Sequence, residues 1–340
     1  MTGAGARRTV AIRAPRLPAS AGPWFNAAPL TGWRGVTLVD FWTYSCVNCL
    51  RTLPALRAWH GRYAAHGLTI LGVHTPEFSF EHEPENVARA LRELGLAYPV
   101  VLDNDRASWG AFANRAWPHR YLIDANGRIV HDHAGEGGEV VTERALRAAL
   151  AAGSGAGPLP ASVYPADTPE RPFALAADTP GQVCVPGSSE LFAGYYRGIA
   201  GNVGGFREDA PADYADPGDY REGYVHLAGR WLSEAEAARF VGPGDGALRL
   251  AFRGLAPNVV LAPPAGGMAR VGVRIDTAAA PGEPMALATL PLDAPRLYRL
   301  TEAAWSVAAR ADDPTALRLL TLLPETPGIA AYSFTFGACG

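Results

Sequence analysis

Two cysteines separated by two residues carry the most distinctive chemistry in this sequence. Cys46 and Cys49 follow an apolar run over residues 36–41 that is typical of a β-strand, and a helical pattern of apolar residues begins at Leu50. Cys46 would therefore lie near a helix N-terminus, where unpaired N–H groups and the helix dipole favour a thiolate. Cys49 would lie one helical turn further on, close enough to form a disulfide with it. The spacing thus predicts a redox-active pair of thiols.

Two other interpretations of the pair are weaker. A zinc site would need a second pair of ligands, and the spacing of His60 and His66 suggests exposed positions on the expected helix. Two structural cysteines in the core would also be ordinary, because free cysteine is often buried. The residues around the pair favour redox chemistry. We therefore expect no metal, and no cofactor other than the Cys46–Cys49 disulfide itself.

Thiol–disulfide exchange assigns different tasks to the two thiols. The Cys46 thiolate would attack a substrate disulfide, and Cys49 would then resolve the mixed disulfide by attacking Cys46. Cys49 must lose its proton for the second step. Asp40 is a candidate base, because a charged residue inside an apolar strand is costly without a role. Glu77, which follows the next expected strand, is a second candidate acid or base, although an exposed loop position would be equally ordinary.

The patterns around these residues also predict the elements that hold them. In chain order they indicate strand 36–42, helix 47–66, strand 68–74, helix 84–94, strand 98–102, helix 108–115, a hairpin of strands 121–123 and 128–133, and helix 142–152. Asn126-Gly127 is a strong signal for the turn of that hairpin. The alternation predicts a layered α/β domain over residues 31–152, preceded by an extended arm over residues 1–30.

A change of composition marks the end of this domain. Residues 153–172 are rich in Gly, Pro, Ser and Ala, which is typical of a linker. Over residues 173–340, short β-like runs recur between Gly/Pro turns, and many short strands favour an all-β sandwich. One helix is expected there over residues 233–240, because Ser233 and Glu236 form a capping-box pattern.

Composition and charge restrict the kinds of partner. The length of 340 residues suits about two domains, and a formal net charge of −3 gives no electrostatic reason to expect nucleic acid. No apolar stretch reaches the roughly 18 residues that would span a bilayer. Residues 1–23 contain arginines but no apolar core of signal-peptide length. We expect either a cytosolic protein or one whose export or membrane segment is missing from this chain.

The residues around the cysteine pair resemble those of the thioredoxin superfamily. The segment Val39-Asp40-Phe41-Trp42, followed by Cys46-Val47-Asn48-Cys49 and Pro54, looks like the active-site segment of that superfamily. The additional helix 84–94 and strand 98–102 resemble the insertion of its TlpA/ResA-like branch. More closely, residues 41–46, 74–78 and 331–337 are similar to the soluble C-terminal part of DipZ-type cytochrome c biogenesis proteins.

This resemblance implies roles for several residues. Asp40 would be the buried aspartate of the superfamily, Glu77 the active-site glutamate of the branch, and Pro118 the cis-proline beside the active site. The chain has no lysine that could pair with Asp40, so its proton relay must differ from that of thioredoxin. A partner would dock in a groove formed by Trp42, Thr43, Tyr44, Ser45, Trp117 and Pro118.

The resemblance also implies partners and a compartment. Protein thiols and disulfides would be the substrates, the direction would be that of a reductase, and the setting would be extracytoplasmic. The membrane-embedded half of DipZ-type proteins is not in this chain. Electrons would then come from a membrane donor of the CcdA/DsbD type on a separate chain, unless this chain is a fragment. The second domain would be a jelly-roll-like sandwich similar to carbohydrate-binding modules.

Three further questions stay open at this level. Thr43-Tyr44-Ser45-Cys46 satisfies the Thr-x-x-Cys part of the peroxiredoxin motif, so a thiol peroxidase is an alternative, although position 39 is Val where that motif has proline. A glycan- or protein-binding module with a vestigial redox domain is another. Cys184 and Cys339 lie near opposite ends of the second domain, and a structural disulfide between them would require a suitable Cα separation.

Overall fold

The chain divides into two compact units, Met1–Asp178 and Thr179–Gly340. The structure is a computed structural model, and it describes residues 12–18, 21–33, 35–153, 157–165, 167–168, 187–254, 256–277, 284–300 and 315–337. Within these residues the first unit combines a sheet with helices, and the elements that are defined in the second are all strands. The predicted order of an α/β domain followed by an all-β domain is therefore confirmed.

A seven-stranded sheet forms the centre of the first unit, with the order β1-β7-β6-β3-β4-β5-β2. Its strands are β1 (Ile12–Arg13), β2 (Trp24–Phe25), β3 (Val36–Trp42), β4 (Leu68–His74), β5 (Val100–Leu102), β6 (His119–Ile123) and β7 (Arg128–Ala134). The central strand β3 is parallel to β4 and antiparallel to β6. Every residue of β3 is buried, which explains its apolar sequence and makes its one carboxyl group conspicuous.

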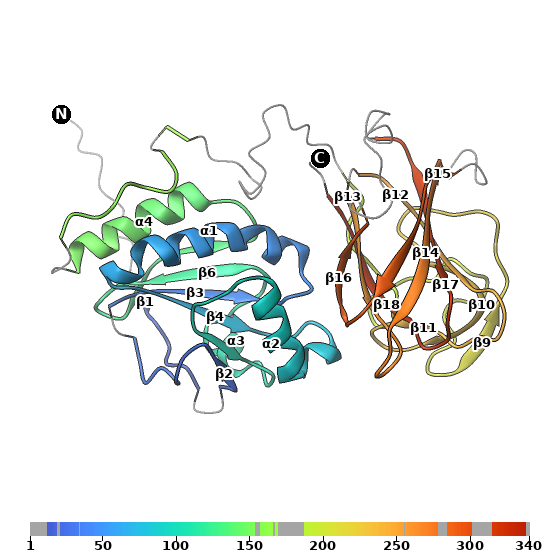
Figure 1. Ribbon diagram of the computed structural model, residues 1–340, viewed down its shortest axis with the longest axis horizontal. Coiled ribbons are helices and arrows are strands. Elements are labelled where there is room, and N and C mark those ends of the chain that lie inside the picture. Colours follow the sequence, from blue (N-terminus) through green and yellow to red (C-terminus); the bar gives the residue numbers. More distant parts are fainter. Residues whose placement is uncertain are drawn as a thin grey trace. The chain divides into compact units, whose positions relative to one another are not determined.

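Helices cover both faces of this sheet. They are α1 (Val47–Tyr63), α2 (Pro84–Glu93), α3 (Ala107–Ala111) and α4 (Glu139–Ala152), with short 3-10 helices η1 (Ala64–His66) and η2 (Ser79–His82). Figure 1 shows α1 and α4 side by side over one face. On the opposite face, Phe41 of β3 packs edge-on against Trp109 and Tyr121, with ring centroids 6.0 and 5.8 Å apart. None of the helices in the described ranges is long and apolar enough to cross a membrane.

The segments on either side of this domain are more firmly attached than an arm and a linker. Strand β1 pairs with β7 and strand β2 pairs with β5, so residues from the expected arm extend both edges of the sheet. After α4, the buried carboxylate of Glu143 accepts backbone N–H groups from Val163 and Tyr164 at 2.7 and 2.9 Å. The first part of the expected linker thus packs on the first unit through hydrogen bonds that composition does not reveal.

Antiparallel strands form the second unit. Its strands are β8 (Leu191–Phe192), β9 (Pro211–Tyr214), β10 (His226–Ser233), β11 (Ala238–Phe240), β12 (Ala247–Phe252), β13 (Ala256–Ala262), β14 (Ala269–Thr277), β15 (Pro284–Leu292), β16 (Arg296–Arg299), β17 (Arg318–Pro324) and β18 (Ala330–Gly337). The main path runs β15-β14-β17-β12-β10-β11-β18-β13-β16. Strand β10 pairs with β12 along its first half and with β11 along its second. Large buried side chains such as Trp231 and Phe334 fill the core.

The helix expected over residues 233–240 is wrong. Ser233 ends β10 and pairs with Ala238 of β11, so the segment is a hairpin. The hydroxyl of Ser233 contacts the Tyr214 hydroxyl at 2.9 Å, which removes it from any capping role. Arg239 donates two hydrogen bonds to Glu234 across the turn. Pairing of this segment with distant strands decided its structure, and a local capping pattern could not show that.

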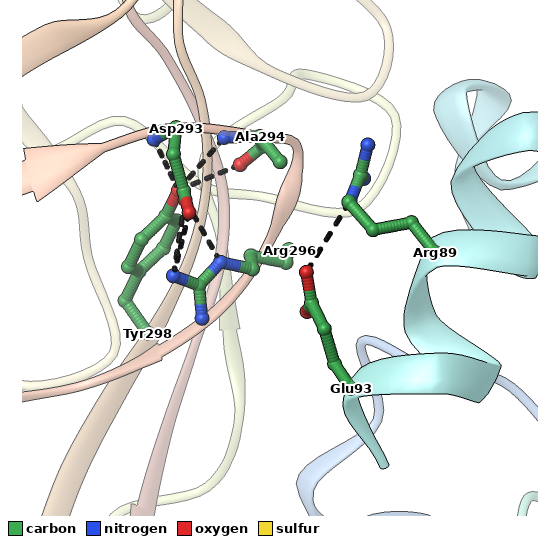
Figure 2. A network of polar contacts seen from close by, with 6 residues as sticks. All are labelled: Arg89, Glu93, Asp293, Ala294, Arg296 and Tyr298. Carbon is green, nitrogen blue, oxygen red and sulfur yellow. Dashed lines mark hydrogen bonds and ion pairs between the residues drawn. The ribbon is translucent and has the colours of Figure 1, made fainter. Parts of the chain in front are cut away.

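Side-chain hydrogen bonds fix the turn between β15 and β16. The Tyr298 hydroxyl donates to the carbonyl oxygen of Ala294 at 2.7 Å, and Arg296 donates two hydrogen bonds to Asp293 (Figure 2). Figure 2 also shows the ion pair of Arg89 and Glu93 on α2, one helical turn apart with an N–O distance of 3.8 Å. Surface pairs of this kind contribute only about 0.3–0.5 kcal/mol, so we assign them no further role. The residues Cys184 and Cys339 lie outside the described ranges, so their pairing stays a prediction.

Candidate active site

Cys46 and Cys49 lie at the start of α1, directly after the loop that follows β3. Cys46 is the N-cap residue, and its Sγ accepts a hydrogen bond from the backbone N–H of Cys49 at 3.3 Å. Both are free thiols, but Cys46 is partly exposed whereas Cys49 is fully buried. Burial, and then the hydrogen bond with Cys46, raise the pKa of Cys49 well above its usual value. The pair therefore has one accessible thiol and one protected thiol that needs a base.

Asp40 of β3 is the carboxyl group whose burial and pKa best suit the role of such a base. It is fully buried, and neither of its oxygens has a hydrogen-bond partner among the described residues. Burial raises its pKa to about 7, although the charge of Arg120 acts in the opposite direction. The Asp40 charge also raises the pKa of Cys49, so the two groups interact inside the protein. A carboxyl that ionises near neutral pH beside a protected thiol is able to accept its proton.

Arg120 supplies the cation that the lysine-free sequence left unassigned. It lies directly opposite Asp40 in the pairing of β3 with β6, and it is fully buried. Its Nη2 donates to the carbonyl oxygen of Gly137, whereas Nε and Nη1 have no partner among the described residues. Burial lowers the pKa of Arg120, and the charges of Asp40 and Glu139 oppose that effect. The sequence could not reveal this pair, because 79 residues lie between Asp40 and Arg120 and only the pairing of β3 with β6 brings them together.

Gly72 of β4 lies on the other side of Asp40 and lets two aromatic side chains approach. A Cβ atom at this position would lie 2.9 Å from Trp42 Nε1 and 3.4 Å from the Tyr98 ring. Burial, and then the charge of Asp40, raise the pKa of Tyr98 well above its usual value. The absence of a side chain at Gly72 thus leaves room for Trp42 and Tyr98 next to the residue that pairs with Asp40.

The loop between β3 and Cys46 is held by a carboxylate that the sequence analysis did not single out. Glu81 of η2 is fully buried and accepts hydrogen bonds from the Thr43 and Ser45 hydroxyls at 2.5 and 2.6 Å. It also accepts the backbone N–H groups of Ser45, Glu77 and Phe78 at 3.2, 2.6 and 3.1 Å. Burial raises the pKa of Glu81, while the hydrogen bonds from Ser45 and Thr43 oppose the rise. The available signal was the pair of hydroxyls just before Cys46, which need partners once buried.

The other predicted site residues of this edge have mixed positions. Glu77 is half-buried and joins the Glu81 network through its backbone N–H. The side chains of the predicted docking loop are buried, including Trp42, Thr43, Tyr44 and Ser45. The catalytic role of Glu77 and the docking role of the loop stay predictions.

Pro118 lies beside the end of β3, as the fold resemblance implied. The Trp117–Pro118 peptide bond is cis, and the next residue, His119, pairs with Phe41. Trp117 is partly exposed, and its indole N–H donates to the carbonyl oxygen of Thr75 at 3.1 Å. Its ring packs on Trp109 with centroids 4.4 Å apart. Of the predicted groove residues, Trp117 is the one whose side chain reaches the surface.

The sequence matches known families in both units. Residues 14–132 match the AhpC/TSA family, and residues 188–337 match the family described as Thioredoxin like C-terminal domain. The DipZ proteins of Mycobacterium tuberculosis and Mycobacterium bovis are 34% identical to this chain over 332 residues, which cover 95% of this chain and 43% of each DipZ protein. The chain thus spans less than half the length of these relatives.

Two shorter relatives match the first unit. The thiol-disulfide oxidoreductase YkuV of Bacillus subtilis is 29% identical over 115 residues, or 34% of this chain and 77% of YkuV. The thiol-disulfide oxidoreductase ResA of Halalkalibacterium halodurans is 33% identical over 103 residues, or 30% of this chain and 54% of ResA. Residues 14–132 thus form a thioredoxin-like domain of the AhpC/TSA family that is similar to ResA and YkuV, and the chain joins this domain to a C-terminal β domain in a segment that matches DipZ over 95% of this chain.

Proposed function

We propose that this chain is a thiol–disulfide oxidoreductase that exchanges electrons with protein cysteines through Cys46 and Cys49. The unequal burial of the two thiols carries the proposal, because it separates an attacking sulfur from a resolving one. The names of YkuV and ResA support the same reaction class. The direction that we propose is reduction of the partner protein.

The reaction needs two sulfur exchanges. The Cys46 thiolate attacks one sulfur of the partner disulfide, forms a mixed disulfide and releases the first partner thiolate. Cys49 then gives up its proton and attacks Cys46, which forms the Cys46–Cys49 disulfide and releases the second partner thiolate. The partner gains two electrons, and the two cysteines of this chain lose them.

Asp40 is the base of the second exchange in this proposal. It accepts the Cys49 proton, because its pKa of about 7 lets it be ionised at neutral pH and protonated by a nearby acid. Arg120 opposes the effect of burial on Asp40 and keeps its charged form accessible. Glu77 would act in proton transfer at the same edge, and the partner peptide would dock in a groove formed by residues 42–45 and the Trp117–Pro118 bond.

The proposal includes a source of electrons and a compartment. Protein disulfides are the substrates, and a membrane donor of the CcdA/DsbD type on a separate chain would reduce the Cys46–Cys49 disulfide. The resemblance to DipZ-type proteins is the reason for proposing extracytoplasmic action. The β domain would then be an accessory module of the jelly-roll type.

Trapping with Cys49→Ser protein tests this function. Without the resolving thiol, mixed disulfides at Cys46 should persist and release partner proteins on reduction, and mass spectrometry would identify their cysteines. Cys46→Ser protein is the control and should capture none. If Cys49→Ser captures no partner and Cys46 is found as sulfenic acid after peroxide treatment, the thiol peroxidase alternative would replace this proposal.

A further inference from the structure

The carboxylate of Glu81 connects the two loops that meet at the carboxyl edge of the sheet. Its Oε1 accepts three hydrogen bonds from the loop before Cys46, from Thr43 Oγ1 and from both N and Oγ of Ser45. Its Oε2 accepts two from the loop after β4, from the backbone N–H groups of Glu77 and Phe78. Glu81 is fully buried and accepts hydrogen bonds from five donors, so its carboxylate links these two loops. We call this set of five hydrogen bonds the Glu81 joint.

The hydrogen bonds of this joint suit an ionised carboxylate. Glu81 is the acceptor in all five, and each of its oxygens meets at least one backbone N–H, which can only donate. Glutamine cannot substitute, although it has the same shape. One end of its amide is an N–H₂ group, which would point at donors from one loop or the other. Replacement of Glu81 by glutamine therefore leaves donors of at least one loop unpaired.

The joint ends one peptide bond away from the nucleophile. Ser45 precedes Cys46, and the backbone N–H of Cys46 contacts the carbonyl oxygen of Thr43 at 3.4 Å. On the other side, Cys46 is fixed by α1, because its Sγ accepts the N–H of Cys49 and its carbonyl oxygen accepts the N–H of Leu50. Displacement of residues 43–45 would thus move Cys46 relative to the partner disulfide.

A buried histidine extends this chain of contacts. His74 Nε2 lies 3.2 Å from Thr43 Oγ1, and burial lowers the pKa of His74 to about 3, so the ring is neutral. The single hydroxyl proton of Thr43 points to Glu81, because a carboxylate can only accept. The backbone N–H of Tyr44 also donates to His74 Nε2 at 3.4 Å, so His74 contacts the loop before Cys46 at two neighbouring residues.

We propose that Glu81 is a positioning residue for Cys46, which acts through the hydroxyls of Thr43 and Ser45 to hold the nucleophile in the orientation for attack on a disulfide. This inference rests on the proposed oxidoreductase function. It assigns to Glu81 a task that is separate from the proton transfer assigned to Asp40.

Reduction of insulin disulfides by the full chain, with dithiothreitol as electron source, tests the proposal. Glu81→Gln should lower kcat/KM by about tenfold or more, since misplacing a reacting group by 1 Å can cost about 100-fold. Thr43→Val should have a similar effect, and Thr43→Ser, which restores the hydroxyl, should remain within about twofold of the unaltered protein. The double variant Glu81→Gln/Thr43→Val should be no slower than Glu81→Gln alone, because the two residues act as one unit. Glu83→Gln, an exposed carboxyl two residues away, is the matched control.

Two results would overturn the proposal. One is an equal kcat/KM for folded Glu81→Gln and the unaltered protein, and the other is an equal loss of kcat/KM for Thr43→Val and Thr43→Ser. If Glu81→Gln does not fold, the comparison of Val with Ser at position 43 decides alone. Failure of the proposed function would look different, since the unaltered protein would then leave insulin oxidised and Cys49→Ser would capture no partner.

Discussion

Two buried carboxyl groups flank the cysteine pair, and their surroundings are opposite. Glu81 accepts five hydrogen bonds from two loops, whereas Asp40 has no hydrogen-bond partner among the described residues. Both are fully buried, and burial is the largest effect on the pKa of each. The two groups differ in what compensates their burial. Glu81 has five hydrogen-bond donors, whereas Asp40 has the charge of Arg120, with no hydrogen bond between them.

The same chemical group, a buried carboxyl, can thus suit two different roles: positioning of a loop for Glu81 and acceptance of a proton for Asp40. Donors that converge on a carboxylate lock both its charge and its neighbours in place. A carboxyl without such donors costs free energy when ionised, so its proton binding becomes sensitive to pH near neutrality. The two proposals agree with this difference: Glu81 positions the loop before Cys46, and Asp40 transfers a proton.

Conversion of Asp40 to asparagine should stabilise the protein at pH 8. The folded protein keeps the Asp40 proton up to about pH 7, whereas the unfolded chain loses it near 3.8. The folded state thus binds more protons in this interval, and the free energy of unfolding falls as pH rises through it. Asp40→Asn removes this loss, which amounts to at most about 4 kcal/mol at 1.36 kcal/mol per pKa unit.

Urea unfolding of Asp40→Asn and the unaltered protein at pH 4 and pH 8 measures this effect. The two free energies should be similar at pH 4 and differ at pH 8 in favour of the variant. A variant that is less stable at pH 8 would show that Asp40 is held by bonds as Glu81 is.

The same change of carboxylate to amide at Glu81 should have the opposite sign. Glu81→Gln leaves buried donors unpaired, and each such group costs about 1–3 kcal/mol, so we expect a loss of about 3 kcal/mol in unfolding free energy. Urea unfolding at pH 7 checks this. An unchanged or increased stability would remove the distinction between the two groups.

Glu143 provides a third buried carboxylate that has no part in the chemistry. It accepts hydrogen bonds from the Tyr63 and Ser162 hydroxyls, both at 2.6 Å, and from two backbone N–H groups. Glu143→Gln should lower the unfolding free energy by about 2 kcal/mol. It should also leave the rate of insulin reduction within about twofold. A large loss of rate with intact folding would mean that other fully hydrogen-bonded carboxylates of this unit also affect the reaction rate of the thiols.

Arg120→Met should shift the pH dependence of the second exchange. Since Arg120 lowers the pKa of Asp40, removal of its charge should move the midpoint upward by about one pH unit, and Arg120→Lys should move it less. Rates of partner release between pH 5 and 9 would show the shift. A midpoint equal in the unaltered protein and Arg120→Met would assign the titration to another group.

Much of this site could be predicted from local sequence, and the missing part has a physical reason. Strand 36–42, the helix after Cys46 and the candidate base Asp40 follow from periodicity and from one charge in an apolar run. Arg120 and Glu81 did not emerge, because each meets its partner through strand pairing or loop packing over long stretches of chain. The hairpin at residues 233–240 was missed for the same reason, since pairing with distant strands outweighed a local helix signal.

The pH dependence of the second exchange in Asp40→Asn tests the central claim most directly. Single-turnover reduction of a fluorescent model disulfide, at saturating concentration, reports release of the second thiol. In the unaltered protein the release rate should rise as pH passes through about 7. In Asp40→Asn that rise should be absent and the rate at pH 7.5 should fall about 100-fold, the usual range for loss of a general base. An unchanged profile in Asp40→Asn would contradict the assignment of Asp40 as the base.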